Sequence, residues 1–337
     1  MSSSSVFSQN LEEIYQQVLQ SDPRLLIDSL GVELGVAREK QAFGALLPQV
    51  SINSNWTENK RKPDGFNRDS YAGERYTFSV RQPLIDMQKY HGWKRSTDLS
   101  SQFNFQQRDT QSIVRLDTIE RYFLLLSAND ELQLIREEKS ATEKKVKQTK
   151  ALYDKQLVKI TEFYEINARL DLLASEEIDA MQSVDLAKEG LSELTNGPVG
   201  SISPLIGSVE FIKRVENIEE WVRNSATSGA LLGLQKAIDA AQRNVSQQKS
   251  GHLPVLELQL SKQKSDIGFE NSTSTSTVTE VAALNLTIPI YSGGQTSGRV
   301  YEATQQLALA QAQLDQEHRK RVKELRDMFL GVNAMVR

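Results

Sequence analysis

The stretch from Trp93 to Glu189 contains neither glycine nor proline. Both residues are common elsewhere, since the chain has 18 glycines and 8 prolines among its 337 residues. In a helix interior proline costs about 3 kcal/mol and glycine about 1 kcal/mol, so a long sequence without either predicts continuous helix. About 60 such residues would form a rod of roughly 90 Å, which is too long to lie inside an ordinary globular core.

One reversal is expected inside this stretch, with Thr161 as the N-cap of the returning helix. After it, apolar residues recur at spacings of three and four, and only Glu177 interrupts them. They are Phe163, Ile166, Leu170, Leu173, Ala180, Val184, Ala187, Leu191 and Leu194. This spacing is typical of a coiled-coil seam and favours contact with a neighbouring helix over a cofactor-binding face. Two antiparallel helices are therefore predicted, at 87–157 and 161–196.

Ahead of the rod the hydrophobic period changes from that of a helix to that of a strand. A helix is predicted over 23–46, because Asp22-Pro23 offers an N-cap and a proline at the first helical position. Strands are predicted at 48–58 and 74–84, where apolar and polar residues alternate. The apolar positions of these strands are Val50, Ile52, Trp56, Tyr76, Phe78 and Val80.

The same pattern occurs again at an offset of 206 residues. Leu47-Pro48 falls on Leu253-Pro254, and Pro83 falls on Pro289. Because 206 is even, the offset preserves the face of the strand on which each residue lies. The second set of apolar positions is Leu256, Leu258, Leu284 and Leu286. The repeated unit is helix, strand, loop, strand and long helix, which predicts an internal duplication.

The predicted fold is mainly α with β, in three parts. Residues 1–196 are the first repeat, and residues 197–225 are a connector, or equatorial segment, with a short helix around 216–222. Residues 226–337 are an incomplete second repeat, with a helix at 228–250, strands at 254–264 and 279–290, and a long helix at 294–337. Counterparts of residues 129–196 would lie beyond Arg337, so we expect a C-terminally truncated chain or a core completed by another molecule.

Composition narrows the possible functions. The formal net charge of −4 gives no reason to expect a nucleic-acid partner. Cysteine is absent, which excludes disulfides, thiolate metal sites and cysteine nucleophiles. No run approaches the roughly 18 apolar residues of a membrane-spanning helix. The first residues lack the basic segment and apolar core of a secretory signal, so either the protein is not exported or its signal peptide is not present in this sequence.

No catalytic, metal or cofactor site is predicted. His91, His252 and His318 are far apart and lack metal-ligand spacing. The segment 293–298 joins a predicted strand to a predicted helix, as phosphate loops do, but it has neither GxGxxG spacing nor the Walker lysine. No nucleophile and base can be paired, so we do not expect an enzyme.

The strands have the length that a membrane barrel requires. A tilted strand of about 9–11 residues crosses a bilayer, and only a closed barrel can do so without unpaired backbone groups. About eight strands are the practical minimum for closure, so the four predicted here would have to be pooled between chains. The alternative is a sheet outside the membrane with one face on a core. The strand pattern alone leaves both alternatives open.

Short motifs flank both strand pairs. They are Gly251-His252-Leu253-Pro254-Val255-Leu256-Glu257-Leu258, Leu286-Thr287-Ile288-Pro289-Ile290-Tyr291-Ser292-Gly293-Gly294, Leu47-Pro48-Gln49-Val50 and Gln82-Pro83-Leu84-Ile85-Asp86. Together they resemble TolC-type outer-membrane efflux proteins, the outer-membrane factors of tripartite efflux pumps and of type I secretion. The resemblance covers about residues 11–337, duplication included.

This resemblance implies a homotrimer with a twelve-stranded barrel in the lipid of the outer membrane and a long helical tunnel through the periplasm. It also implies a periplasmic adaptor (membrane fusion) protein and an inner-membrane pump as partners. The chain would then be a passive exit duct without a cofactor, and the apolar strand positions would face lipid. The exported substrates would be drugs, other small molecules or polypeptides.

The resemblance also implies a role for the reversal between the long helices. In the family this turn lies at the periplasmic tip, where the tunnel closes and the adaptor binds. The matching residues are Gln156, Leu157, Val158, Lys159, Ile160, Thr161 and Glu162. Glu162 occupies the position of an acidic residue that helps to hold the gate shut. The basic and tyrosine residues of the partner tip have no counterpart in this sequence.

A different class of function remains as an alternative, namely a soluble periplasmic coiled-coil adaptor or scaffold. An adaptor normally has one helical hairpin between two half-domains. This chain instead has two copies of a helical segment flanked by strands, which favours the channel.

Overall fold

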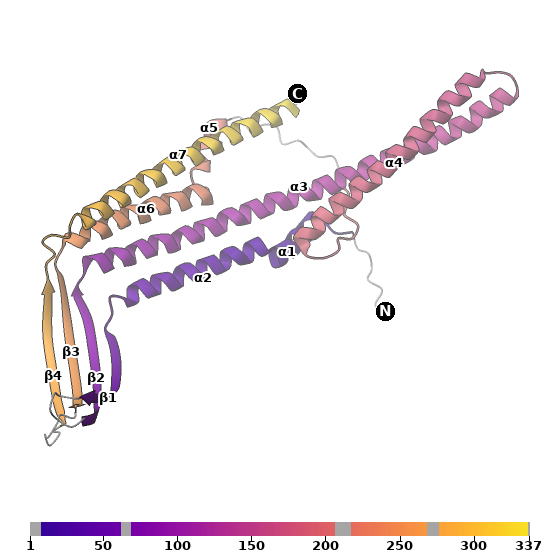
Figure 1. Ribbon diagram of the computed structural model, residues 1–337. Coiled ribbons are helices and arrows are strands. Elements are labelled where there is room, and N and C mark those ends of the chain that lie inside the picture. The colour runs from indigo at the N-terminus through magenta and orange to yellow at the C-terminus, as the bar shows by residue number, and fades with distance from the viewer. Residues whose placement is uncertain (1–7, 62–68, 206–216, 268–275, 336–337) are drawn as a thin grey trace. The chain divides into compact units, whose positions relative to one another are not determined.

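The computed structural model describes residues 8–61, 69–205, 217–267 and 276–335. The chain divides into two compact units, Met1–Ser29 with Arg108–Lys213 and Leu30–Gln107 with Arg214–Arg337. Figure 1 labels the helices and strands, which are α1 (Leu11–Ser21), α2 (Pro23–Gly44), β1 (Gln49–Arg61), β2 (Asp69–Ile85), α3 (Met87–Asp154), α4 (Ile160–Thr195), α5 (Ile218–Ser225), α6 (Gly229–Lys249), β3 (Val255–Ile267), β4 (Thr277–Thr287) and α7 (Gln295–Met335). The described part is mainly helical with one sheet, as predicted.

The order of helix, strand, strand and long helix occurs in α2–β1–β2–α3 and again in α6–β3–β4–α7. The duplication itself stays a prediction. So do the part boundaries at 196 and 225, because the compact units divide the chain elsewhere. The predicted helix around 216–222 begins, at Glu216, outside the described residues, and α5 occupies Ile218–Ser225. The last two residues of the predicted helix 294–337 also lie outside them.

In the first unit α4 runs back along the end of α3 (Figure 1). Every predicted seam residue of α4 is buried or half-buried, so the seam is confirmed. The interruption at Glu177 has a physical cause. Its carboxylate accepts hydrogen bonds from Arg136 Nε at 2.9 Å and from Lys139 Nζ at 2.7 Å, both on α3. An ion bridge therefore replaces one apolar contact of the seam.

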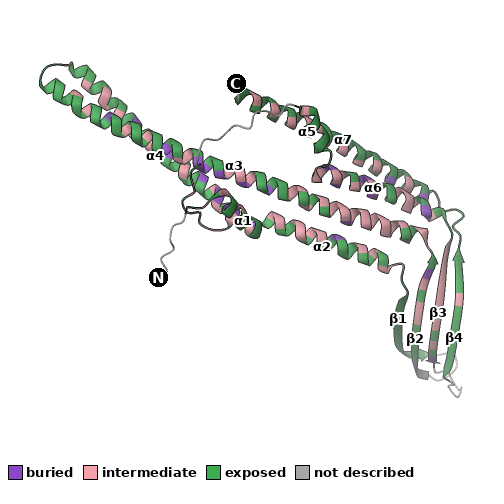
Figure 2. Ribbon diagram, turned by 180° about the vertical axis from the view of Figure 1, so that it is seen from behind, coloured by how far each residue is buried: buried purple, intermediate pink, exposed green. Residues whose placement is uncertain are grey.

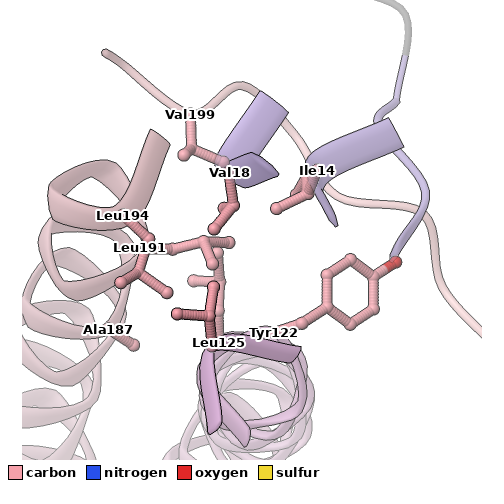
Figure 3. Close-up of a cluster of buried hydrophobic side chains, with 9 residues drawn as sticks. Ile14, Val18, Tyr122, Leu125, Ala187, Leu191, Leu194 and Val199 are labelled. Atoms are coloured by element: carbon pink, nitrogen blue, oxygen red, sulfur yellow. The ribbon is translucent and has the colours of Figure 1, made fainter. Parts of the chain in front are cut away.

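A hydrophobic cluster closes the base of this hairpin, where α1 lies against α3 and α4 (Figure 3). Its buried members are Ile14, Val18, Val114, Tyr122, Leu125, Ala187, Leu191, Leu194 and Val199. The hydroxyl of Tyr122 donates a hydrogen bond to the carbonyl of Ser203 at 2.9 Å. The backbone of Gln9 also pairs with the segment around Ile202. The cluster therefore joins both ends of the first unit to the hairpin.

A chain of ion pairs crosses the junction of α1 and α2. Asp22 caps α2 as predicted, because it accepts a hydrogen bond from the backbone N–H of Arg24 at 2.8 Å. The guanidinium of Arg24 lies 2.7 Å from Asp22 and 2.9 Å from Asp117 of α3. Arg121 contacts Asp117 at 2.9 Å and Glu193 of α4 at 2.6 Å. Five alternating charges therefore connect the cap of α2 to both long helices.

In the second unit α2 approaches α3 closely at a glycine. A Cβ on Gly35 would lie only 2.9 Å from Cδ2 of Phe103, so only glycine fits without displacing that ring. On another side of α3, Asp98 lies 3.9 Å from Lys236 Nζ and 3.6 Å from Arg243 Nε, both on α6.

No helix among the described residues is long and apolar enough to cross a membrane.

The four strands form one antiparallel sheet in the order β1-β2-β3-β4. β1 and β2 are longer than the predicted strands 48–58 and 74–84, and a bulge shifts the register between Pro83 and Ile85. β4 ends at Thr287 and does not reach 290 as predicted, because Pro289 lacks the N–H that a ladder requires. Gly293 and Gly294 then adopt positive φ angles of 62° and 81°, which accounts for glycine at the turn into α7.

Replacing Leu191 by alanine should lower the midpoint of thermal unfolding, followed by far-ultraviolet circular dichroism. Leu191 is fully buried, and a cavity at such a site costs about 2–5 kcal/mol. Leu186→Ala is the matched control on the same helix, because Leu186 is 66% exposed. That variant should change stability by less than about 0.5 kcal/mol. Equal losses in the two variants would contradict the assignment of the core.

Asp22 should make stability depend on acid pH. Burial alone would raise the pKa of Asp22, but the hydrogen bonds and charge of Arg24 outweigh it and hold that pKa below the ordinary 3.8. Stability from the pair is therefore complete above the ordinary pKa and is lost as the pH falls through the lowered folded-state value. Asp22→Asn should lower the thermal midpoint at neutral pH and not in strong acid. The exposed Asp185→Asn is the control, and a pH-independent difference for Asp22→Asn would contradict the pairing.

Candidate functional site

Two regions carry the predicted functional residues, the sheet of the second unit and the α3–α4 reversal of the first. In the sheet, Val50 lies opposite Val80, and Val80 lies opposite Leu260, so one face continues from strand to strand. All ten predicted positions share this face, which we call the apolar face. They are Val50, Ile52, Trp56, Tyr76, Phe78, Val80, Leu256, Leu258, Leu284 and Leu286. The other side is the polar face.

The apolar face is bare. Ile52 is 75% exposed, Trp56 66% and Leu284 65%. Within the second unit the helices extend away from one end of the sheet and do not lie along it (Figure 2). A sheet of this kind outside a membrane would bury such residues on a core. The described part of the second unit provides no such core, which leaves the apolar face available to another molecule or to a nonpolar solvent.

Aromatic residues mark the loop end of the apolar face. The Nε1–H of Trp56 donates to the hydroxyl of Tyr76 at 3.2 Å, and the two rings meet edge to face at 5.9 Å. The hydroxyl of Tyr76 lies 3.3 Å from the carboxylate of Glu74, to which it donates. Both aromatic side chains thus combine an apolar ring with a satisfied polar end, the combination that is enriched at membrane–water interfaces.

Both outer strands of the sheet lack a second partner within the described residues. β1 pairs only with β2, and β4 pairs only with β3. Each strand therefore has one edge of backbone donors and acceptors open to another strand. The sheet can be extended at both ends by other copies of the same sheet.

The reversal between α3 and α4 lies where the sequence predicts it. α3 ends at Asp154, Gln156 adopts a positive φ of 63°, and α4 begins at Ile160. The ring of Tyr153 stacks on that of Phe163, with centroids 6.5 Å apart. Of the predicted tip residues only Val158 is half-buried. The other six are exposed, namely Gln156, Leu157, Lys159, Ile160, Thr161 and Glu162.

The predicted N-cap of the returning helix is wrong. The cap is Lys159, whose backbone is extended and whose side chain makes no capping hydrogen bond. The tight turn at Gln156 lets the chain re-enter a helix early, so Thr161 already lies in the first turn. Glu162 follows in that turn, where a carboxylate interacts favourably with the helix dipole.

The ion network of Asp22, Arg24, Asp117, Arg121 and Glu193 was not predicted. Its one local signal is the spacing of four between Asp117 and Arg121, which suits an ion pair on a single helix. Within the described residues no group of three or more histidine, aspartate or glutamate side chains is placed to hold a metal ion. Among the described residues the features that stand out are surfaces.

Comparisons with known proteins agree with these features. A sequence model of the family "Outer membrane efflux protein" matches residues 225–336. The outer membrane protein TolC of Escherichia coli (strain K12) is 26% identical to the chain over 348 residues, which are 98% of this chain and 69% of that protein. The TolC protein of Vibrio cholerae is 26% identical over 99% of this chain and 77% of its own length.

Over nearly its whole length the chain is similar to TolC-type outer-membrane efflux proteins. It is an exit channel for efflux or secretion, located in the outer membrane and extending into the periplasm. Another relative is the alkaline protease secretion protein AprF of Pseudomonas aeruginosa, 26% identical over 96% of this chain and 69% of that protein. These relatives are channel proteins and not enzymes, and they disfavour the alternative of a soluble adaptor or scaffold.

Solved structures show that this chain has the fold of known channels. The crystal structure of CusC matches it with a TM-score of 0.83 at 12% identity, over 95% of this chain and 74% of CusC. The outer membrane protein VceC of Vibrio cholerae matches with a TM-score of 0.81 at 14% identity, over 96% of this chain and 79% of VceC. The fold is thus retained at an identity too low to transfer residue roles.

Proposed function

We propose that three copies of this chain join their sheets edge to edge into one barrel that crosses the outer membrane. The observation that carries this proposal is a four-stranded sheet with a bare apolar face and two open edges. Hydrocarbon cannot satisfy the backbone groups of an open edge, so a sheet can enter a membrane only when it closes on itself. Closure needs about eight strands or more, which one chain does not have and three chains exceed.

In this barrel the apolar face meets lipid and the polar face lines the passage. From Val50 to Trp56 the apolar positions of β1 extend over roughly 20 Å at about 3.3 Å per residue. The lipid-facing band of outer-membrane barrels is about 25 Å tall, and aromatic girdles border it. The pair of Trp56 and Tyr76 would lie in the outer girdle. Alternation along each strand thus supplies one surface for hydrocarbon and one for water.

The long helices then form the periplasmic part of a passive duct. Such a duct needs an inner-membrane pump for energy and a periplasmic adaptor to join the two. The proposed adaptor contact and gate are the exposed tip residues from Gln156 to Glu162, with the half-buried Val158 holding the turn. The duct performs no bond chemistry. Its selectivity and opening depend on the shape and charge of the passage.

Val50→Asp should reduce the amount of folded trimer in the outer-membrane fraction far more than Ser51→Asp. The two residues are neighbours on β1, but they lie on opposite faces of the sheet. A charge facing lipid near the middle of the bilayer costs up to about 2–4 kcal/mol, whereas a charge facing water costs little. Trimer is measured as the slowly migrating band of unheated gel samples. Equal losses for the two variants would contradict the assignment of the faces.

Cross-linking tests the tip. Because the chain has no cysteine, Leu157→Cys provides a single attachment point for a maleimide photo-cross-linker. Leu157 is 67% exposed, and Leu134→Cys is a matched control because Leu134 is 65% exposed on α3, away from the turn. We expect an adduct with the periplasmic adaptor from position 157 and much less from position 134. The opposite preference would place the adaptor elsewhere on the hairpin.

A further inference from the structure

The polar face of the sheet carries few charges. Most of its described side chains are amides and hydroxyls. These amide and hydroxyl residues are Gln49, Ser51, Asn53, Asn55, Thr57, Thr77, Ser79, Gln259, Ser261, Gln263, Ser265, Thr277, Thr279, Asn285 and Thr287. Among the side chains that the structure describes on this face, the charged ones are Arg75, Arg81 and Glu257. Two arginines and one glutamate leave one net positive charge on the described part of the face.

The two arginines are exposed and unpaired. Neither Arg75 nor Arg81 has an ion pair or a side-chain hydrogen bond within the described part of the chain. The register accounts for this, because uncharged residues lie directly opposite on both sides. Arg75 lies between Asn55 and Ser265, and Arg81 lies between Gln49 and Gln259.

Glu257 does not neutralise this charge. It lies opposite Pro83 and Asn285, diagonally from Arg81, and no ion pair joins the two. Both guanidinium groups therefore keep their donors and their charge available to whatever passes over the polar face. Arginine binds carboxylates and phosphates in this way, through a planar array of donors.

We propose that Arg75 and Arg81 make the barrel segment of this channel selective for anionic solutes, those that carry carboxylate or phosphate groups. This inference rests on the proposed closed barrel, in which the polar face lines the passage. In a narrow passage with low-dielectric walls, rings of arginine raise the local concentration of anions and lower that of cations. The two rings are six residues apart on β2, about 20 Å, so each acts on a solute separately at ordinary ionic strength.

A cysteine reporter on the polar face measures this effect. Ser79→Cys, in the otherwise cysteine-free chain, lies two residues from Arg81 on the same face. The full chain is reconstituted in vesicles and treated with sulfonatoethyl or trimethylammonioethyl methanethiosulfonate, which are anionic and cationic reagents of similar size. The readout is the ratio of their reaction rates, normalised to the same ratio for a free thiol. Any change in thiol pKa affects both reagents alike and cancels.

We expect the anionic reagent to react faster at Ser79→Cys, and the rate ratio to fall about threefold when Arg81→Gln is added in about 0.1 M salt. Arg75→Gln together with Arg81→Gln should lower it further. Arg81→Lys, which conserves the charge, should retain the ratio. Lys262→Gln is the control on the apolar face and should leave it unchanged.

The outcomes separate this inference from the proposed barrel. If Ser79→Cys reacts but Arg81→Gln does not change the ratio of the two reaction rates, the arginines do not make the passage selective for anions. The polar face would still line a water-filled passage. If Val80→Cys reacts and Ser79→Cys does not, the polar face does not line the passage. Both the inference and the proposed barrel are then overturned.

Discussion

Backbone groups at the edge of a sheet must be paired wherever water is absent, and this requirement governs the molecule. The sheet β1-β2-β3-β4 presents an uncovered apolar face and two open edges within the described residues. Its apolar face is favourable in hydrocarbon. The unpaired backbone N–H and C=O groups of its edges are costly there until other strands pair with them. In the proposed barrel, assembly and membrane insertion are therefore coupled. Helices α2, α3, α6 and α7 adjoin this sheet, because each begins or ends within eight residues of a strand.

The long helices satisfy a different condition, since they are stable with little buried surface. α3 and α4 bury a narrow seam, and the contacts that close it lie at its two ends. At the tip Tyr153 stacks on Phe163, and at the base Leu191 lies within the cluster that α1 completes. Between them the ion bridge at Glu177 joins the helices without an apolar contact. Such a hairpin can be long because its stability accumulates along the seam and does not depend on one core.

Features that depend on local periodicity could be predicted from the sequence. The seam and the shared face of the ten strand positions follow from periods of about 3.6 and 2, which hold wherever an element continues. What could not be predicted depends on contacts between distant residues or on the exact turn geometry. Arg24 meets Asp117 across 93 positions, and Gly35 approaches Phe103 on another helix. The cap lies at Lys159 and not at Thr161 because Gln156 adopts a left-handed conformation. Glutamine does not favour that conformation, so its residue type gives no signal for the turn.

The distribution of charge distinguishes the two faces independently of hydropathy. On the apolar face the rows from Leu256 and Leu286 to Val50 and Val80 contain no charge, and the charges begin with the ion pair of Lys262 and Glu280 at 2.7 Å. On the polar face Arg81 lies one residue from Val80 and has no ion-pair partner within the described chain. An unpaired guanidinium is costly in hydrocarbon and costs little in water. Adjacent residues of one strand thus favour different solvents, and the wall of the proposed barrel, between lipid and water, would provide both.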